Sequence, residues 1–158
     1  MSPTMPDVTL RQALASDAGD VFACVRRAYE RFERRLGCSP APMLQNYRQV
    51  IASEQVWVAE LDGRTMGVLV MARRAQGLIL DNVAVDPLAQ GKGVGRELLL
   101  LAERLALQAG QQSLDVYTNV LMVENRVLYG RFGYEEYETR LEDGFFRVYM
   151  RKSLTAAT

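Results

Sequence analysis

The sequence predicts a mixed α/β domain of the α+β kind, in which a mostly antiparallel sheet of seven strands is flanked by four helices. One observation is an Asp-Gly pair between two strand-like segments, 55–61 and 65–73, because that dipeptide is the strongest local sign of an antiparallel hairpin. A second is a set of long segments with apolar residues at helical spacing. The third is a succession of strand, helix and strand over 78–118, which predicts one crossover connection within a mixed sheet.

The first third of the chain predicts one strand and two helices. Residues 7–14 alternate as a strand does, and Ser16 and Asp17 offer a cap for a helix that runs to Gly37. The following residues, GCSPAP, cannot continue a helix, since proline removes a main-chain donor and clashes with the preceding turn. Helical spacing returns over 43–53, where we expect the second helix.

The remaining elements are predicted from turn residues that separate periodic segments. The hairpin is followed by a strand, a helix, a strand, a helix and a closing pair of strands, which we expect at 78–85, 95–110, 113–118, 119–132, 133–140 and 144–152. Gly110 is suited to end the long helix. No repeat, linker or low-complexity segment interrupts this order.

Length and composition restrict the class of protein. The 158 residues, 49% of them hydrophobic, suffice for one compact domain, 1–158. Basic and acidic residues balance at 19 each, so no overall field favours nucleic acid or an anionic membrane, and any anion site must be local. Two cysteines and no histidine predict neither a zinc site nor a disulfide framework, which is typical of the cytoplasm. We find no export signal and no apolar run near the roughly 18 residues of a membrane span.

The segment AVDPLAQGKGVGREL, residues 84–98, places three glycines where a strand gives way to a helix. Such a turn can leave main-chain N–H groups open for a phosphate, although it also occurs as a plain tight connection. A P-loop is excluded because Gly93, not Ser or Thr, follows Lys92. A dinucleotide fingerprint is excluded because its third glycine would fall on Arg96 or Leu98.

The pattern that fits is Q-x-x-G-x-G, formed by Gln90, Gly93 and Gly95 after the strand end AVDP. It resembles the pyrophosphate-binding segment of the GNAT superfamily of N-acetyltransferases. The later stretch TNVLMVENRVLYGRFGY resembles a second family signature, with Asn125, Tyr129, Gly133 and Tyr134 at its key positions, and GFFRVYMRKSL is similar to the family's closing hairpin. The likeness covers most of 55–152. One departure is Met122, at a position where many members carry asparagine.

The resemblance implies acetyl-CoA as co-substrate, no metal, and a set of residues that hold the cofactor. The strand before the loop would pair its main chain with the pantetheine amides as an added strand does. Asn125 would hydrogen-bond the same arm, unless it is a solvent-facing helix residue, and the basic residues of the loop would neutralise phosphates, unless they are plain surface charges. The implied binding residues are Val83, Ala84, Val85, Gln90, Gly91, Lys92, Gly93, Val94, Gly95, Arg96 and Asn125.

Acetyl transfer to an amine needs a proton donor for the departing thiolate and an acceptor for the amine proton. A tyrosine stays protonated at neutral pH, and the resemblance implies Tyr129 as the general acid, with packing as the alternative. Without histidine the acceptor must be a carboxylate. Asp81 is the candidate, because it interrupts the apolar run LILDNVAV, although a structural hydrogen bond would also explain it. Glu124 and Glu60 are weaker alternatives.

The acceptor is not identified by the sequence. We expect it against the first two helices, where five arginines (Arg26, Arg27, Arg31, Arg34, Arg35) gather with glutamates at pairing distance. A small-molecule amine, a protein N-terminus or a lysine all remain open. A non-catalytic coenzyme A sensor is the alternative to an enzyme, and a homodimer formed through the last two strands is a further interpretation.

Overall fold

The computed structural model describes residues 7–154 and confirms the predicted class and order of elements. The helices are α1 (Ala18–Leu36), α2 (Tyr47–Ser53), α3 (Val94–Gln108) and α4 (Val123–Arg131). The strands are β1 (Val8–Gln12), β2 (Gln55–Leu61), β3 (Arg64–Arg74), β4 (Gly77–Val85), β5 (Ser113–Asn119), β6 (Glu135–Glu142) and β7 (Phe145–Ser153). They form one sheet in the order β1-β2-β3-β4-β5-β7-β6.

The pairing of the strands is mixed, as expected from the single crossover. β4 and β5 run in parallel, with Leu80 opposite Val116. Antiparallel ladders join β1 to β2, β2 to β3, β5 to β7 and β6 to β7. The chain divides into two compact units, Met1–Met71 with Asn82–Ala102 and Ala72–Asp81 with Glu103–Thr158.

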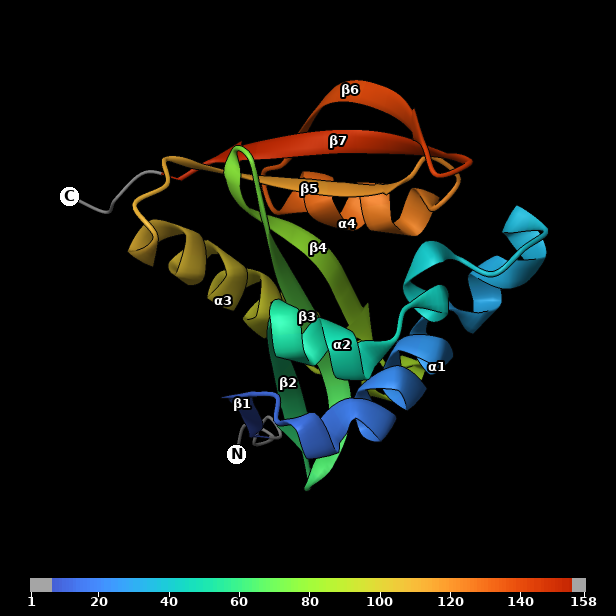
Figure 1. The fold of residues 1–158 in the computed structure, drawn as a ribbon, viewed down its shortest axis with the longest axis vertical. Helices are drawn as coiled ribbons and strands as arrows, with labels where there is room; N and C mark the ends of the chain where they lie inside the picture. The colour runs from blue at the N-terminus through green and yellow to red at the C-terminus, as the bar shows by residue number, and fades with distance from the viewer. Residues whose placement is uncertain (1–6, 155–158) are drawn as a thin grey trace, which may run out of the picture. The chain divides into compact units, whose positions relative to one another are not determined.

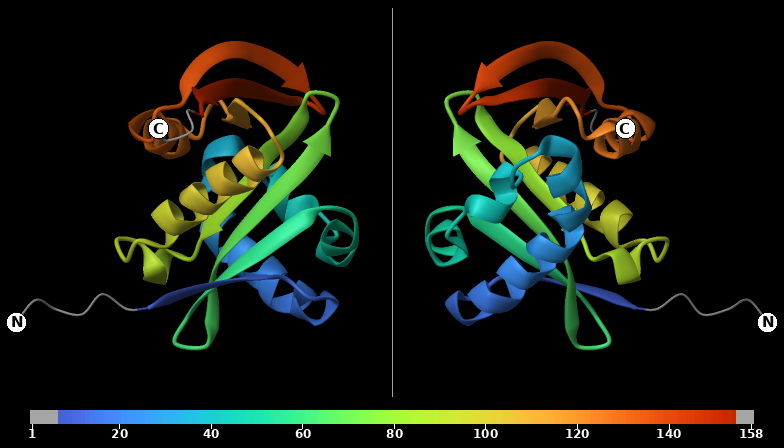
Figure 2. Two further views of the ribbon diagram at one scale, coloured as in Figure 1. Left: turned by 90° about the vertical axis from the view of Figure 1, so that its left-hand side faces the viewer. Right: turned by 90° about the vertical axis from the view of Figure 1, so that its right-hand side faces the viewer.

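The first unit is built around the β2–β3 hairpin. α1 presents an apolar stripe at spacings of three and four residues, with Val21, Val25 and Phe32 almost fully buried. Figure 2 shows α1 and α2 on one side of the hairpin and the start of α3 on the other. A left-handed glycine, Gly37, ends α1, as its position in the sequence predicts.

The second unit carries α4 along a three-stranded antiparallel part of the sheet. α4 lies beside β5 and β7 in Figure 1, and β6 is the next element after α4 along the chain. The buried side chains of Leu114, Val116, Val148 and Met150 form the core on these strands. Its helix and strands therefore bury one apolar layer, as expected for a sheet face covered by a helix.

The predicted second helix starts later than expected. Residues Ala41–Leu44 form a 3₁₀ turn, and α2 begins only after Asn46. The reason is a side-chain cap, because Oδ1 of Asn46 accepts hydrogen bonds from the main-chain N–H groups of Arg48 and Gln49 at 3.1 and 3.4 Å. The prediction of helix from residue 43 was therefore wrong.

The predicted helix over 119–132 also begins too early. β5 runs on to Asn119, which stands opposite Arg147 of β7. The Asn119 side chain then accepts from the N–H of Leu121 at 2.9 Å and closes a turn. α4 starts only at Val123, because Asn119 is paired within the sheet and the Asx turn holds the residues that follow it in a non-helical conformation.

The expected cap of α1 is replaced by another interaction. Asp17 precedes the helix, but its carboxylate makes no cap hydrogen bond. It accepts instead from both terminal nitrogens of Arg11, at 2.7 and 2.9 Å, and from the N–H of Leu14 at 2.7 Å. The Arg11 hydrogen bonds lower the pKa of Asp17 to about 2, from an ordinary value of 3.8.

We expect the variant Asp17→Asn to lose about 1–2 kcal/mol of unfolding free energy at pH 7. The folded-state pKa of Asp17 lies below its ordinary value. Its contribution is therefore present above pH ~4 and disappears as the pH falls through ~2. Urea denaturation of both proteins across this range would show the difference shrinking toward zero, and an equal loss at every pH would contradict the assignment.

Gly67 in β3 leaves no room for a side chain. An added Cβ would lie 2.6 Å from Cγ1 of Val94, 2.9 Å from Cδ1 of Leu98 and 3.2 Å from Cβ of Ala59. We expect Gly67→Ala to destabilise the protein by about 1–3 kcal/mol, because α3 would have to move away from the strand. Gly19→Ala is the control, since nothing lies within 4 Å of that position, and because Gly19 lies in α1 the variant should be as stable as the parent or up to about 1 kcal/mol more stable.

Candidate functional site

The glycine-rich loop after β4 leaves main-chain donors open. Gly91 and Gly93 have φ values of 80° and 83°, in the left-handed region that a Cβ disfavours. The main-chain hydrogen bond from the N–H of Glu97 to the carbonyl of Gly93, 3.1 Å long, spans the first turn of α3. The N–H groups of residues 94–96 precede it and have no partner within the helix. This arrangement is typical of an anion site.

The side chains of the loop divide into exposed and packed ones. Gln90, Lys92 and Arg96 are exposed, whereas Val94 is buried. A Cβ at Gly95 would lie 3.5 Å from Cγ2 of Val85, which is ordinary contact. The packing of the first helical turn therefore does not require a glycine at position 95.

The end of β4 is held from the side of α1. Val83 and Ala84 are buried and Val85 is half-buried. The hydroxyl of Tyr29 lies 2.6 Å from Oδ1 of the buried Asn82 and 3.2 Å from the carbonyl of Val83. These polar contacts fix the main chain of the strand immediately before the loop.

Asp86 fixes the start of the loop. It is only 2% exposed, accepts from the N–H of Leu88 at 2.9 Å, and forms an ion pair with Nε of Arg27. Its own N–H donates to the carbonyl of Met66 at 2.8 Å. The loop therefore leaves β4 in a direction that both α1 and β3 determine.

Asp81 lies in the second unit and has a partner that sequence reasoning missed. The hydroxyl of Tyr117 on β5 donates to Oδ1 of Asp81 at 2.5 Å, and Nη2 of Arg74 lies 3.9 Å from the same oxygen. Tyr117 stacks on Tyr149 with ring centroids 5.5 Å apart. Burial raises the pKa of Tyr117, and the Asp81 charge raises it further. The structural hydrogen bond foreseen as an explanation of Asp81 is thus present.

Tyr117 could have been found from the sequence only through strand pairing. It follows Val116, and Asp81 follows Leu80, so two neighbouring residues of parallel strands place both side chains on one face. Nothing in the local sequence around Tyr117 distinguishes it from a packing residue.

Tyr129 is buried in α4, at 3% exposure. Its ring packs edge-on against Tyr134, with centroids 6.0 Å apart. Burial raises the pKa of Tyr129 and the charge of Asp81 adds to this, so the phenol stays protonated at neutral pH. Packing and proton donation are compatible in this position.

Asn125 faces inward rather than toward solvent. Its Nδ2 donates to Oγ1 of Thr118 at 3.3 Å and approaches the sulfur of Met122 at 3.6 Å. The predicted residues thus fall into two groups. The loop and Val83–Val85 belong to the first unit, and Asp81, Asn125 and Tyr129 belong to the second.

Within residues 7–154, no three histidine, cysteine or carboxylate side chains gather as ligands of a metal ion would. No helix in the same range is both long and apolar enough to cross a membrane.

The family is identified by a match of residues 52–136, just over half of the chain, to the model of the acetyltransferase (GNAT) domain. The chain belongs to the GNAT acetyltransferase family. The matched range contains the loop, Asp81 and Tyr129. A search of curated protein sequences finds no match to this GNAT chain.

Solved structures share the fold at low sequence identity. The PaiA N-acetyltransferase from Thermoplasma acidophilum, in complex with coenzyme A, is 16% identical, with 93% of this chain and 99% of that chain covered and a TM-score of 0.73. The ribosomal-protein-S18-alanine N-acetyltransferase from Escherichia coli is 17% identical, with 96% and 97% covered and a TM-score of 0.73. The yncA protein from Salmonella typhimurium, solved with its cofactor acetyl-CoA, is 17% identical, with 96% of each chain covered and a TM-score of 0.69.

The hydrogen bond between Tyr117 and Asp81 can be measured by a double-mutant cycle. We expect Tyr117→Phe and Asp81→Asn to show a coupling energy of about 1–3 kcal/mol in unfolding, because the bond involves a charged acceptor. Tyr134→Phe paired with Asp81→Asn is the control and should give a coupling near zero. Additive losses for the first pair would contradict the contact.

Proposed function

We propose that this protein transfers the acetyl group of acetyl-CoA to a primary amine by direct attack, with Tyr129 as general acid and Asp81 as general base. The observation that carries the proposal is the loop, where two left-handed glycines come just before the N–H groups of residues 94–96, which have no main-chain partner within residues 7–154. Membership of the GNAT family supports its use for a coenzyme A diphosphate. On this proposal residues 1–158 act as one acetyltransferase domain, in the cytoplasm.

The loop would bind the diphosphate through main-chain donors between Gln90 and Gly95. The N–H groups of Gln90 and Lys92 already donate to the carbonyls of Pro87 and Ala89, so the other N–H groups of the stretch would supply these donors. Lys92 and Arg96 are exposed beside these donors and would neutralise phosphate charge. The space that Gly95 leaves open would admit the phosphate oxygens close to the backbone. Val83–Val85 would pair with the pantetheine amides, and Oδ1 of Asn125 would accept from the same arm.

Tyr129 would hold the proton that the thiolate takes up. Acetyl-CoA supplies an acyl group activated as a thioester. The raised pKa of Tyr129 keeps the phenol protonated before transfer, and the surrounding aromatic and apolar side chains keep bulk water from competing for that proton. This residue binds no substrate charge in the ground state, so its effect should fall on turnover.

Asp81 would take a proton from the acceptor's ammonium group, which frees the nitrogen lone pair to attack the thioester carbonyl. Its side chain is one quarter exposed, so water or an amine can reach the carboxylate. Tyr117 occupies Oδ1 and thereby orients the group, while Oδ2 is left for the acceptor. Tyr117 is a positioning residue on this proposal.

The molecule that receives the acetyl group would be an amine. One structural neighbour is the ribosomal-protein-S18-alanine N-acetyltransferase and another is a nourseothricin acetyltransferase, so a protein and nourseothricin are both acceptors within this fold. A small-molecule amine, a protein N-terminus and a lysine are the classes to screen, by following acetyl-CoA-dependent thiol release with the purified protein.

Calorimetry with coenzyme A tests the binding part of the proposal. We expect saturable heat with the folded protein. Absence of heat at millimolar coenzyme A would overturn both the enzyme and the non-catalytic sensor. Saturable binding without turnover on any amine would favour the sensor.

We expect Tyr129→Phe to lower kcat by about 100-fold or more, while the dissociation constant of coenzyme A changes little, because only proton donation is lost. Tyr134→Phe is a matched control from the same aromatic pair. The Tyr134 hydroxyl is buried without a partner among residues 7–154, so its removal should leave both turnover and stability near the parent values. Equal turnover of the two variants would exclude Tyr129 as the acid.

A further inference from the structure

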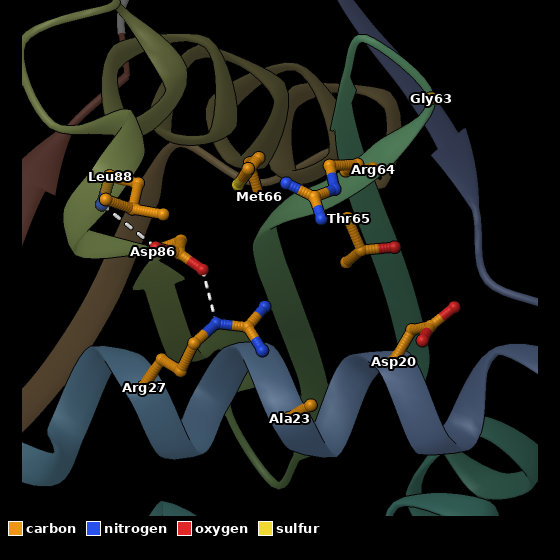
Figure 3. A pocket seen from close by; sticks show the side chains of 9 residues that line it. All are labelled: Asp20, Ala23, Arg27, Gly63, Arg64, Thr65, Met66, Asp86 and Leu88. Carbon is orange, nitrogen blue, oxygen red and sulfur yellow. Dashed lines mark hydrogen bonds and ion pairs between the residues drawn. The ribbon is translucent and has the colours of Figure 1, made fainter.

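A hollow lies in the first unit, apart from the residues expected to bind coenzyme A. It has a volume of about 440 Å³, and its walls are α1, the β2–β3 turn with the start of β3, and the residues after β4. Figure 3 shows the side chains that line it. Its polar groups are Asp20, Arg27, Arg64, Thr65 and Asp86.

Arg27 is held in a fixed orientation at one end of this hollow. Its Nε donates to Asp86, whose carboxylate is almost fully buried and also caps the turn at Leu88. A guanidinium has five N–H donors, so four remain on the two terminal nitrogens. These nitrogens face the hollow in Figure 3, and within residues 7–154 they have no other acceptor.

Arg64 adds a second guanidinium to the same space. It extends from the first residue of β3 toward the hollow in Figure 3, beside the hydroxyl-bearing side chain of Thr65. Among the residues that the structure describes, no carboxylate pairs with it. Because Asp86 is already engaged by Arg27, two guanidiniums face one space without a carboxylate between them, which suits an oxyanion.

Asp20 restricts the class of ligand. It lies on α1 seven residues before Arg27, which corresponds to about 10 Å along the helix, and no residue of the described range pairs with its carboxylate. A multiply charged anion would be repelled by this group. A molecule with a carboxylate at one end and an ammonium at the other would satisfy both ends of the hollow.

We propose that this hollow binds a small ω-amino acid, whose two charges are separated by several carbons, with its carboxylate on Arg27 and Arg64 and its ammonium on Asp20. The site is independent of the proposed acetyl transfer, since none of these residues belongs to the loop, to β4 or to the pair Tyr129 and Asp81. Its ligand need not be the acceptor of the reaction.

The test compares two probes that differ only in the ammonium group, hexanoate and 6-aminohexanoate, by amide chemical-shift titration of the full chain without coenzyme A. Both should shift the amides of Ala23, Thr65 and Leu88, and 6-aminohexanoate should bind about five times more tightly. Arg64→Gln should weaken both probes about fivefold, whereas Asp20→Asn should remove only the advantage of the ammonium.

The substituted residues are exposed, so these variants should fold as the parent does. Arg64 and Asp20 are exposed, whereas replacing Arg27 would leave the buried Asp86 charge unpaired. Arg26→Gln is the control, because it removes the same charge from an exposed position of α1 that does not line the hollow, and it should bind both probes as the parent does.

Three outcomes would overturn the proposal: no shift at these amides with either probe, equal affinity for the two probes, or unchanged affinity in Arg64→Gln. None of them depends on cofactor binding or turnover, so the proposed acetyl transfer would stand or fall separately.

Discussion

The buried carboxylate of Asp86 is the constraint on which the first unit depends. A charge that is 2% exposed must be compensated, and here Arg27 of α1 and the N–H of Leu88 do so. The residue also bonds to β3 through its own N–H. One residue thus joins α1, β3 and the turn after β4, and these three elements determine where the glycine loop begins.

In the second unit the buried polar groups are mainly the hydroxyls of tyrosines. Tyr117, Tyr129, Tyr134 and Tyr149 are all mostly or wholly buried, and burial raises the pKa of each, to about 12 for Tyr149. These four phenols therefore stay protonated at neutral pH. Two carboxylates accept hydrogen bonds from this set, Asp81 from Tyr117 and Glu142 from Tyr149.

Much of the fold could be predicted because its signals are local. The Asp-Gly hairpin, the apolar stripe of α1 and the glycine at its end are all encoded within a few residues, and the structure has each of them. The errors were at boundaries, where Asn46 and Asn119 use their side chains to bond the main chain and shift a helix start. A side-chain cap changes the stability of a helix start by a few tenths to about 2 kcal/mol. The spacing of apolar residues does not reveal so small a contribution.

By itself the sequence determined the element order, the glycine loop and the family resemblance, because main-chain conformation at Gly91 and Gly93 and apolar periodicity depend on local residue types. Only the tertiary structure decided the partners of the polar side chains. Asp17 forms an ion pair with Arg11, Asp86 forms one with Arg27, and Asp81 accepts a hydrogen bond from Tyr117. The partners in each pair are apart in the sequence and are brought together by the packing of helices and strands. A charge or hydroxyl bonds whatever group packing brings within about 3 Å, and that distance is set by the fold.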